Sequence, residues 1–196
     1  CFARFVVDKK LINKDIISVQ TKSGILKLQL QTDGEVTVNM GIPEFLPQKV
    51  PFEAKTQSSS YNLDIAGKKI KLSVVAIGNP HAIIEVDDIE KAPVETLGAE
   101  IERHQRFPNR VNAGFMQIVH KQEISLRVYE RGVGETLACG SGACAAVVAG
   151  IMLKKLDNQV SVKLRGGKLK INWAGAGSAV MMTGPATSVY EGHIEI

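Results

Sequence analysis

The chain has 196 residues, of which 44% are hydrophobic and 22% charged, and its formal net charge is +4. This length is enough for one large domain or two small domains with a buried core. The lysine and arginine residues are spread along the chain, without a basic run or interleaved aromatic residues, which argues against a nucleic-acid partner. The three cysteines, an odd number, argue against a disulfide scaffold and favour a reducing, cytoplasmic location.

The N-terminal residues 1–10 have the pattern of a helix, but no capping residue or lead-in precedes them. The chain also lacks a starting methionine and shows no signal peptide. We therefore expect it to be part of a longer protein. The longest uncharged run, residues 136–153, reaches the lower length limit of a membrane span. Small and polar residues fill its first part and Gly150 interrupts the rest, so we expect a buried helix and no membrane partner.

Most of the remaining chain alternates between apolar and polar residues, as half-buried strands do. Residues 26–30 and 36–40 flank an Asp-Gly pair, and residues 160–164 and 169–173 flank a Gly-Gly pair, which predicts two hairpins. The pattern predicts further strands at residues 70–77, 82–86, 115–119, 124–130, 179–183 and 187–194, and helices at residues 94–104 and 142–156. The fold class is therefore α+β. Residues 41–61, rich in proline and serine, predict an irregular connection with a domain boundary near its start.

Cys139 stands where a predicted strand passes through a glycine-rich turn into the predicted helix. Unpaired backbone N–H groups and the positive end of the helix dipole at such a position favour the thiolate, and they can also bind a carboxylate ligand. A buried structural cysteine is the alternative. The flanking Gly140-Ser141-Gly142 leaves the backbone accessible, which favours a functional thiol. Cys144, flanked by alanines inside the helix, is expected to be a small core residue.

Three further polar residues stand out beside predicted strands. In the strand at residues 124–130, Glu130 falls on the same face as the apolar residues, and a buried carboxylate there is costly unless it is paired or used. A strand ending one residue earlier would leave it solvated. His81, after Asn79-Pro80, is an exposed loop residue, an acid/base group or a residue that orients a thiol. Asn112 is by default a turn-forming residue.

Four segments of the chain resemble segments of the diaminopimelate epimerase family. The longest, residues 128–146, includes Glu130-Arg131-Gly132 and Ala138-Cys139-Gly140-Ser141-Gly142. Residues 78–81 (Gly-Asn-Pro-His) and 111–117 (Val-Asn-Ala-Gly-Phe-Met-Gln) resemble two further segments in the expected order. Residues 1–6 resemble the helix that follows the family's first catalytic cysteine motif. The resemblance thus covers the whole chain, and its cysteine segment is highly specific.

This resemblance implies an isomerase that interconverts LL- and meso-diaminopimelate in bacterial lysine and cell-wall biosynthesis, without pyridoxal phosphate, another cofactor or a metal. Two cysteines face each other across the substrate α-carbon. One, as thiolate, removes the α-proton, and the other, as thiol, donates a proton to the opposite face. The expected partners are this small amino acid and a second copy of the chain, since the family tends to form homodimers.

The resemblance also assigns roles to residues of this chain. Cys139 is one of the two acid/base thiols, and His81 and Glu130 tune the thiol pair. The expected substrate contacts come from Asn79, Asn112, Glu130, Arg131, Gly140 and Ser141, with the backbone N–H groups after Cys139 receiving the substrate carboxylate. Tyr190 matches a dimer-contact position.

The implied fold has two pseudo-symmetric halves, each a curled, mainly antiparallel sheet around a central helix, with the active site between them. We expect residues 40–184 to form the C-terminal half, and residues 1–39 with 185–196 to be the remnant of a truncated N-terminal half. The family's Cys-Gly-Asn-Gly motif, which carries the other catalytic cysteine, and its Gly-Asn-Asp-Phe segment are absent. Cys1 matches a non-catalytic cysteine, so we expect this fragment alone to be inactive.

Two other functions stay open from the sequence. One is a non-catalytic domain that binds an amino acid or a partner at the helix N-terminus. The other is a different racemase of the two-cysteine superfamily, such as one that acts on proline. The Glu-Arg-Gly-x-Gly-Glu-Thr run at residues 130–136 favours diaminopimelate.

Overall fold

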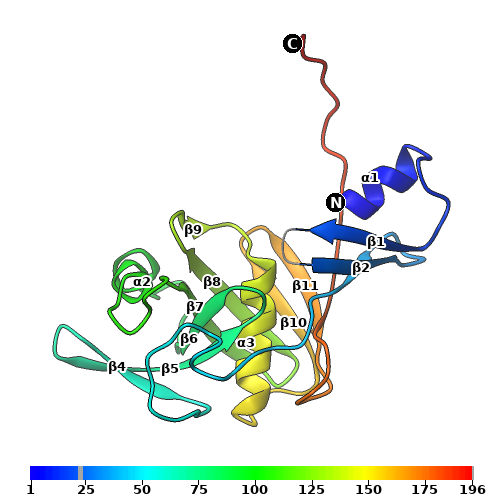
Figure 1. Ribbon diagram of the computed structural model, residues 1–196. Coiled ribbons are helices and arrows are strands. Elements are labelled where there is room, and N and C mark those ends of the chain that lie inside the picture. Colours follow the sequence, from blue (N-terminus) through cyan, green and yellow to red (C-terminus); the bar gives the residue numbers. More distant parts are fainter. Residues whose placement is uncertain (22–23, 196) are drawn as a thin grey trace. The chain divides into compact units, whose positions relative to one another are not determined.

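The computed structural model describes residues 1–21 and 24–195, and the chain divides into two compact units (Figure 1). The first unit contains Cys1–Asn39 and Thr183–Ile196, and the second contains Met40–Met182. The predicted N-terminal remnant, residues 1–39 with 185–196, includes residues 22, 23 and 196, which lie outside the described part. Its assignment to a truncated half stays a prediction.

The first unit is one short helix with a small antiparallel sheet. It consists of α1 (Phe2–Asp8), β1 (Ile16–Thr21), β2 (Gly24–Leu30) and β3 (Val36–Asn39). Strands β2 and β3 pair from Leu28↔Val38 to Leu30↔Val36, which confirms the predicted Asp-Gly hairpin. Ala3 and Val6 of α1 are buried in a small core with apolar residues of this sheet. The strand β1 was not predicted, although Ile17 and Val19 alternate with Ser18 and Gln20 along it.

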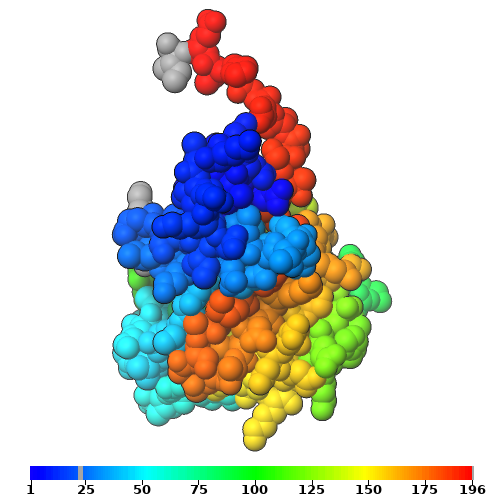
Figure 2. All heavy atoms as spheres, turned by 90° about the vertical axis from the view of Figure 1, so that its right-hand side faces the viewer, coloured from blue at the N-terminus to red at the C-terminus, as the bar shows by residue number. Residues whose placement is uncertain are grey.

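The C-terminal segment corrects one prediction. Residues 187–194 were expected to form a strand, but the segment has no regular secondary structure and runs as a narrow thread of atoms (Figure 2). Val189, Tyr190 and Ile194 are all more than 80% exposed. A strand needs a neighbour to pair its backbone groups, and no strand of the described residues pairs with this segment. Alternation alone therefore gave the wrong result.

The second unit is a curled sheet around a central helix. Its elements are β4 (Tyr61–Ile65), β5 (Lys68–Ala76), β6 (Pro80–Glu85), α2 (Val94–Glu102), β7 (Asn112–His120), β8 (Glu123–Glu130), β9 (Gly134–Thr136), α3 (Gly140–Met152), β10 (Gln159–Leu164) and β11 (Gly167–Asn172), followed by β12 (Met181–Gly184), which continues into the first unit. The strand order is β11-β10-β8-β7-β6-β5-β4, and β9 pairs with β8. Most neighbours are antiparallel, whereas the β6–β7 and β8–β10 pairs are parallel.

Helix α3 is apolar on all sides because the sheet surrounds it (Figure 1). Its residues from Gly142 to Gly150 are all buried, and they share one core with Ile124, Leu126 and Val128 of β8. A second core covers the opposite face of the sheet, where α2 packs. Successive residues of β6 and β7 point alternately into these two cores. The predicted α+β class and the predicted central helix are thereby confirmed, and so is the second hairpin, between β10 and β11.

None of the helices in the described part of the chain is long and apolar enough to cross a membrane. The uncharged run of residues 136–153 is instead mostly the buried helix α3, as expected.

Candidate active site

Cys139 and Glu130 meet in the second unit, between the end of a strand and the beginning of the central helix. Glu130 is the last residue of β8 and Cys139 is the N-cap of α3. The Cys139 thiol donates a hydrogen bond to Oε2 of Glu130, with Sγ and Oε2 3.0 Å apart. Val128 is buried against α3, and period two in β8 places Glu130 on that face as well. The prediction that Glu130 shares the apolar face is confirmed.

The structure does not favour the thiolate form that the sequence predicted for Cys139. Cys139 is only 5% exposed, and the pKa of its thiol is raised to about 11, mainly by burial and also by the Glu130 carboxylate. The backbone N–H of Gly142 lowers this pKa, as expected at a helix N-terminus, but burial outweighs that effect. The structure therefore favours a protonated thiol that donates to a carboxylate, and not the thiolate expected from the sequence.

The glycine at position 142 is explained by the space around this thiol. A Cβ atom at Gly142 would lie 3.2 Å from Sγ of Cys139 and 3.1 Å from Cγ2 of Val128. A larger residue would crowd the sulfur against the strand. The glycine thus lets the first turn of α3 approach the thiol closely.

His81 reaches the same place from strand β6. Its Nε2 lies 3.0 Å from Oδ1 of Asn79 and 3.1 Å from Oγ of Ser141, the second residue of α3. Oγ of Ser141 in turn lies 3.8 Å from Sγ of Cys139. The Asn79 oxygen can only accept a hydrogen bond, so it favours the tautomer with the proton on Nε2.

The other ring nitrogen of His81 has no hydrogen-bond partner among the described residues. His81 is fully buried, and its Nδ1 is an unpaired acceptor in the Nε2–H tautomer. Burial lowers the pKa of His81 to about 3, and the Arg131 charge acts in the same direction. The imidazole is therefore neutral, and its buried Nδ1 lone pair is open to a donor.

Asn112 forms hydrogen bonds both to strand β6 and to the turn that follows strand β8. Its Nδ2 donates to the carbonyl oxygen of Pro80 at 3.0 Å, and its Oδ1 accepts the backbone N–H of Arg131 at 2.9 Å. Asn112 is buried at the start of β7, so it is not a turn residue on the surface. Its substrate contact stays a prediction. The side chain of Arg131 is exposed and donates to the carbonyl oxygen of Asn109.

The predicted residues thus fall into one cluster, with one exception. Cys139, Glu130, Ser141, His81 and Asn79 form a chain of contacts. Asn112 and Arg131 lie beside it, and Gly140 is the first residue of α3. Tyr190 belongs to the first unit and is exposed, and its dimer role stays a prediction. Among residues 1–21 and 24–195, no group of His, Cys, Asp and Glu side chains has the arrangement of a metal site.

Sequence reasoning missed two polar residues beside the cluster. Thr136, at the end of β9, donates a 2.6 Å hydrogen bond to Oε1 of Glu130. Glu102 of α2 is almost fully buried and accepts the backbone N–H of Gly132 at 2.7 Å. The spacing of Val94, Gly98, Ile101 and Glu102 on one helical face could have identified Glu102 as buried.

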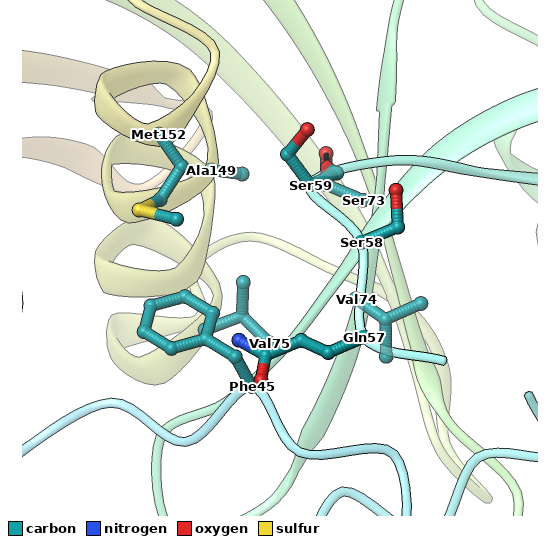
Figure 3. Close-up of a pocket in the computed structure, with 9 residues that line it drawn as sticks. All are labelled: Phe45, Gln57, Ser58, Ser59, Ser73, Val74, Val75, Ala149 and Met152. Atoms are coloured by element: carbon teal, nitrogen blue, oxygen red, sulfur yellow. Dashed lines mark hydrogen bonds between the residues drawn. The ribbon is translucent and has the colours of Figure 1, made fainter. Parts of the chain in front are cut away.

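A separate hollow of about 350 Å³ lies near the other end of α3 (Figure 3). Ala149 and Met152 of the helix face Ser59 and Ser73 across it. At 1.5 Å of rise per residue, Ala149 lies about 15 Å along the helix axis from Cys139. None of the candidate residues lines this hollow, so it is distinct from the cluster around Cys139.

A family model, diaminopimelate epimerase, matches residues 73–189. Across all 196 residues the chain is 54% identical to diaminopimelate epimerase of Pseudomonas syringae pv. tomato and 52% identical to that of Ectopseudomonas mendocina, and it covers 71% of each. The chain belongs to the diaminopimelate epimerase family. The prediction from its motifs is therefore confirmed, and the chain is an isomerase of the epimerase type.

Solved structures share the fold of this diaminopimelate epimerase family member at low sequence identity. A hydroxyproline epimerase from Agrobacterium vitis matches with a TM-score of 0.66 and 15% identity, over 94% of this chain and 62% of that chain. A phenazine biosynthesis protein of the PhzF family from Bacillus anthracis matches with a TM-score of 0.63 and 16% identity, over 99% of this chain and 73% of that chain. These likenesses confirm the α+β fold with its curled sheet.

Proposed function

We propose that the chain carries one half of a cofactor-independent, two-thiol epimerase that interconverts LL- and meso-diaminopimelate in lysine and cell-wall biosynthesis. The observation that carries this proposal is the hydrogen bond from the Cys139 thiol to the Glu130 carboxylate. A thiol held against a carboxylate is suited to exchanging a proton, since the carboxylate can take the thiol proton and return it. The substrate is proposed from the diaminopimelate epimerases that are 52–54% identical to the chain.

The proposed reaction moves one proton at each face of the substrate α-carbon. In one direction, Cys139 donates its S–H proton to the carbanion while the opposite cysteine, as thiolate, takes the α-proton. In the other direction, Glu130 first accepts the Cys139 proton, the resulting thiolate removes the α-proton, and the opposite cysteine, as thiol, donates its proton to the other face. The α-proton of an amino acid is a very weak acid, so the developing negative charge needs preorganised donors in a site shielded from water.

The second thiol of this mechanism comes, in our proposal, from outside the 196 residues. Cys144 is fully buried in the core around α3, so a substrate α-carbon cannot reach its thiol. His81 is proposed to serve the second thiol, because its buried Nδ1 is an unpaired acceptor. The N–H groups of Gly140 and Ser141 at the beginning of α3 are proposed to hold the substrate α-carboxylate. The homodimer and the cytoplasmic location stay predictions.

Turnover by the enzyme expressed from the complete open reading frame tests the function. We expect LL-diaminopimelate to be converted to the meso isomer, and proline and hydroxyproline to be left unchanged. Cys139→Ala should abolish conversion. Cys144→Ala, which removes the other thiol of the same helix, should keep it. Conversion by the Cys139→Ala enzyme, or a preference for proline, would contradict the proposal, and binding of diaminopimelate without turnover would favour the non-catalytic alternative.

A further inference from the structure

The Glu130 carboxylate has a different donor on each oxygen. The Cys139 thiol donates to Oε2, at 3.0 Å, and the Thr136 hydroxyl donates to Oε1, at 2.6 Å. The terminal torsion of a glutamate is broad and has no sharp preference of its own. A donor on the second oxygen therefore fixes the plane of the carboxylate, and with it the direction in which Oε2 faces.

Strand pairing places the Thr136 hydroxyl beside Glu130. In the β8–β9 pair, Thr136 lies opposite Val128, and Gly134 lies opposite Glu130. Residues directly opposite each other in an antiparallel pair share one face, so Thr136 and Val128 both face α3. Glu130, two residues beyond Val128, is the diagonal neighbour of Thr136 on that face.

Strand β9 is short, but it is held firmly. Glu135, its middle residue, accepts two hydrogen bonds from Arg127 of β8, at 2.7 Å and 2.8 Å. Arg165, after β10, lies 3.0 Å from the same carboxylate. Bidentate pairing of arginine with a carboxylate gives a defined geometry. The position of the neighbouring Thr136 is therefore set by an ion pair that points away from the site.

We propose that Thr136 is a positioning residue of the epimerase, whose hydroxyl holds the Glu130 carboxylate with Oε2 directed at the Cys139 thiol. This inference rests on the proposed function, in which Glu130 takes the thiol proton. During that transfer the S–H bond breaks, an O–H bond forms at Oε2, and the negative charge moves from the carboxylate to the sulfur. Thr136 acts through Glu130 and does not exchange a proton itself.

If Thr136 only stabilised the end of β9, the expected effect of its replacement would differ from the one that our proposal predicts. Valine has nearly the shape of threonine and favours strands, so Thr136→Val would then leave the Cys139 thiol unchanged. Under our proposal, loss of the hydroxyl releases Glu130, and Cys139 loses the acceptor that favours its protonated form. More thiolate is then present at a given pH. Thr136→Ser keeps the hydroxyl and should behave like the unchanged chain.

The test is the rate at which iodoacetamide alkylates Cys139 at pH 8, because the thiolate is the reacting species. Peptide mapping by mass spectrometry separates Cys139 from Cys1 and Cys144. We expect the rate to rise about threefold or more in Thr136→Val and to stay unchanged in Thr136→Ser, in line with a fall in the thiol pKa of about half a unit. Thr96→Val, the same change on the exposed face of α2, is the matched control and should have no effect.

A double-mutant cycle separates this inference from the function on which it rests. If Thr136 acts through Glu130, Thr136→Val adds nothing in a Glu130→Gln background. Acceleration by Glu130→Gln but not by Thr136→Val would overturn the role of Thr136 and leave the function intact. Equal acceleration by Thr136→Val in both backgrounds would also overturn it. No acceleration by Glu130→Gln would overturn the proposed Cys139–Glu130 pair itself.

Turnover provides a second readout in the enzyme from the complete open reading frame. A positioning residue of the proton-transfer pair should affect kcat more than KM. We expect Thr136→Val to lower kcat about 10-fold or more, which is a fraction of the rate enhancement that general acid–base catalysis contributes. The same variant should change KM by less than about threefold. Thr136→Ser should keep most of the activity. Equal losses in the serine and valine variants would overturn the role of the hydroxyl.

Discussion

The Cys139 thiol and the Glu130 carboxylate form a hydrogen bond from the beginning of a buried helix to the end of a buried strand. The two residues are nine positions apart, and the short strand β9 lies between them in the chain. The carboxylate raises the pKa of the thiol, in the same direction as burial. Cys139 is therefore held as a proton donor with its acceptor already in contact.

Replacement of Glu130 by glutamine should lower the pKa of the Cys139 thiol. Both the hydrogen bond to the carboxylate and its negative charge favour the protonated thiol, so their removal favours the thiolate. The absorbance of the thiolate near 240 nm, followed from pH 7 to pH 11, measures this shift. Turnover should fall about 100-fold or more, because the acid/base partner is lost. Glu100→Gln, an exposed change on α2, is the control, and an unchanged Cys139 titration in Glu130→Gln would contradict the pairing.

His81 should make the stability of the protein depend on pH in the acid range. Its pKa is lowered to about 3, mainly by burial, so the folded state binds its proton less readily than the unfolded state. The stabilisation is fully present above pH 6.5, the ordinary pKa, and is lost as the pH falls toward 3. The free energy of unfolding should fall by up to about 1.4 kcal/mol per pH unit from this residue.

Urea unfolding at a series of pH values measures the His81 contribution. The His81→Gln variant should have a shallower fall between pH 6.5 and pH 4 than the unchanged protein. His120→Gln, a change at an exposed histidine, should keep the original slope. The same slope in the His81→Gln variant would show that this histidine is not buried in its neutral form.

Removal of Arg127 from its ion pair with Glu135 should destabilise the protein strongly. Both side chains are largely buried, and two hydrogen bonds join them. Arg127→Met leaves the carboxylate with Arg165 alone, and we expect the free energy of unfolding to fall by about 3 kcal/mol. Lys91→Met, which breaks an exposed pair with Asp88, should have a much smaller effect. Chemical denaturation measures the free energy of unfolding of both variants. Equal losses would contradict the conclusion that the buried Arg127–Glu135 pair holds β9 in place.

Glu102 should hold the turn that follows Glu130. Its carboxylate accepts the backbone N–H of Gly132, and Arg103 and Arg110 lie within ion-pair distance of it. Glu102→Ala leaves that N–H without its acceptor, and we expect a loss of about 1–3 kcal/mol of stability. Glu102→Gln keeps an acceptor oxygen and should lose less. Thermal unfolding of both variants checks this, and an alanine variant as stable as the glutamine variant would contradict the role.

The strands and helices that build the site were largely predictable, because their signals are local. The alternation Ile124, Leu126, Val128 placed Glu130 on the buried face, and the glycine-rich turn placed Cys139 at a helix N-terminus. The three-residue strand β9 is too short to carry a period, so the role of Thr136 was not visible. The charge state of Cys139 was predicted wrongly because the helix N-terminus is a local feature, whereas burial depends on the packing of the whole core.

In the proposed reaction, Cys139 passes a proton to or from the substrate α-carbon. The most direct test is the deuterium content at that carbon when LL-diaminopimelate is incubated in deuterated water with the enzyme from the complete open reading frame. We expect every meso product molecule to carry deuterium at the inverted carbon from the earliest time points, and the Cys139→Ala enzyme to form no product. Early product without deuterium, or inversion by the Cys139→Ala enzyme, would contradict the proposed reaction.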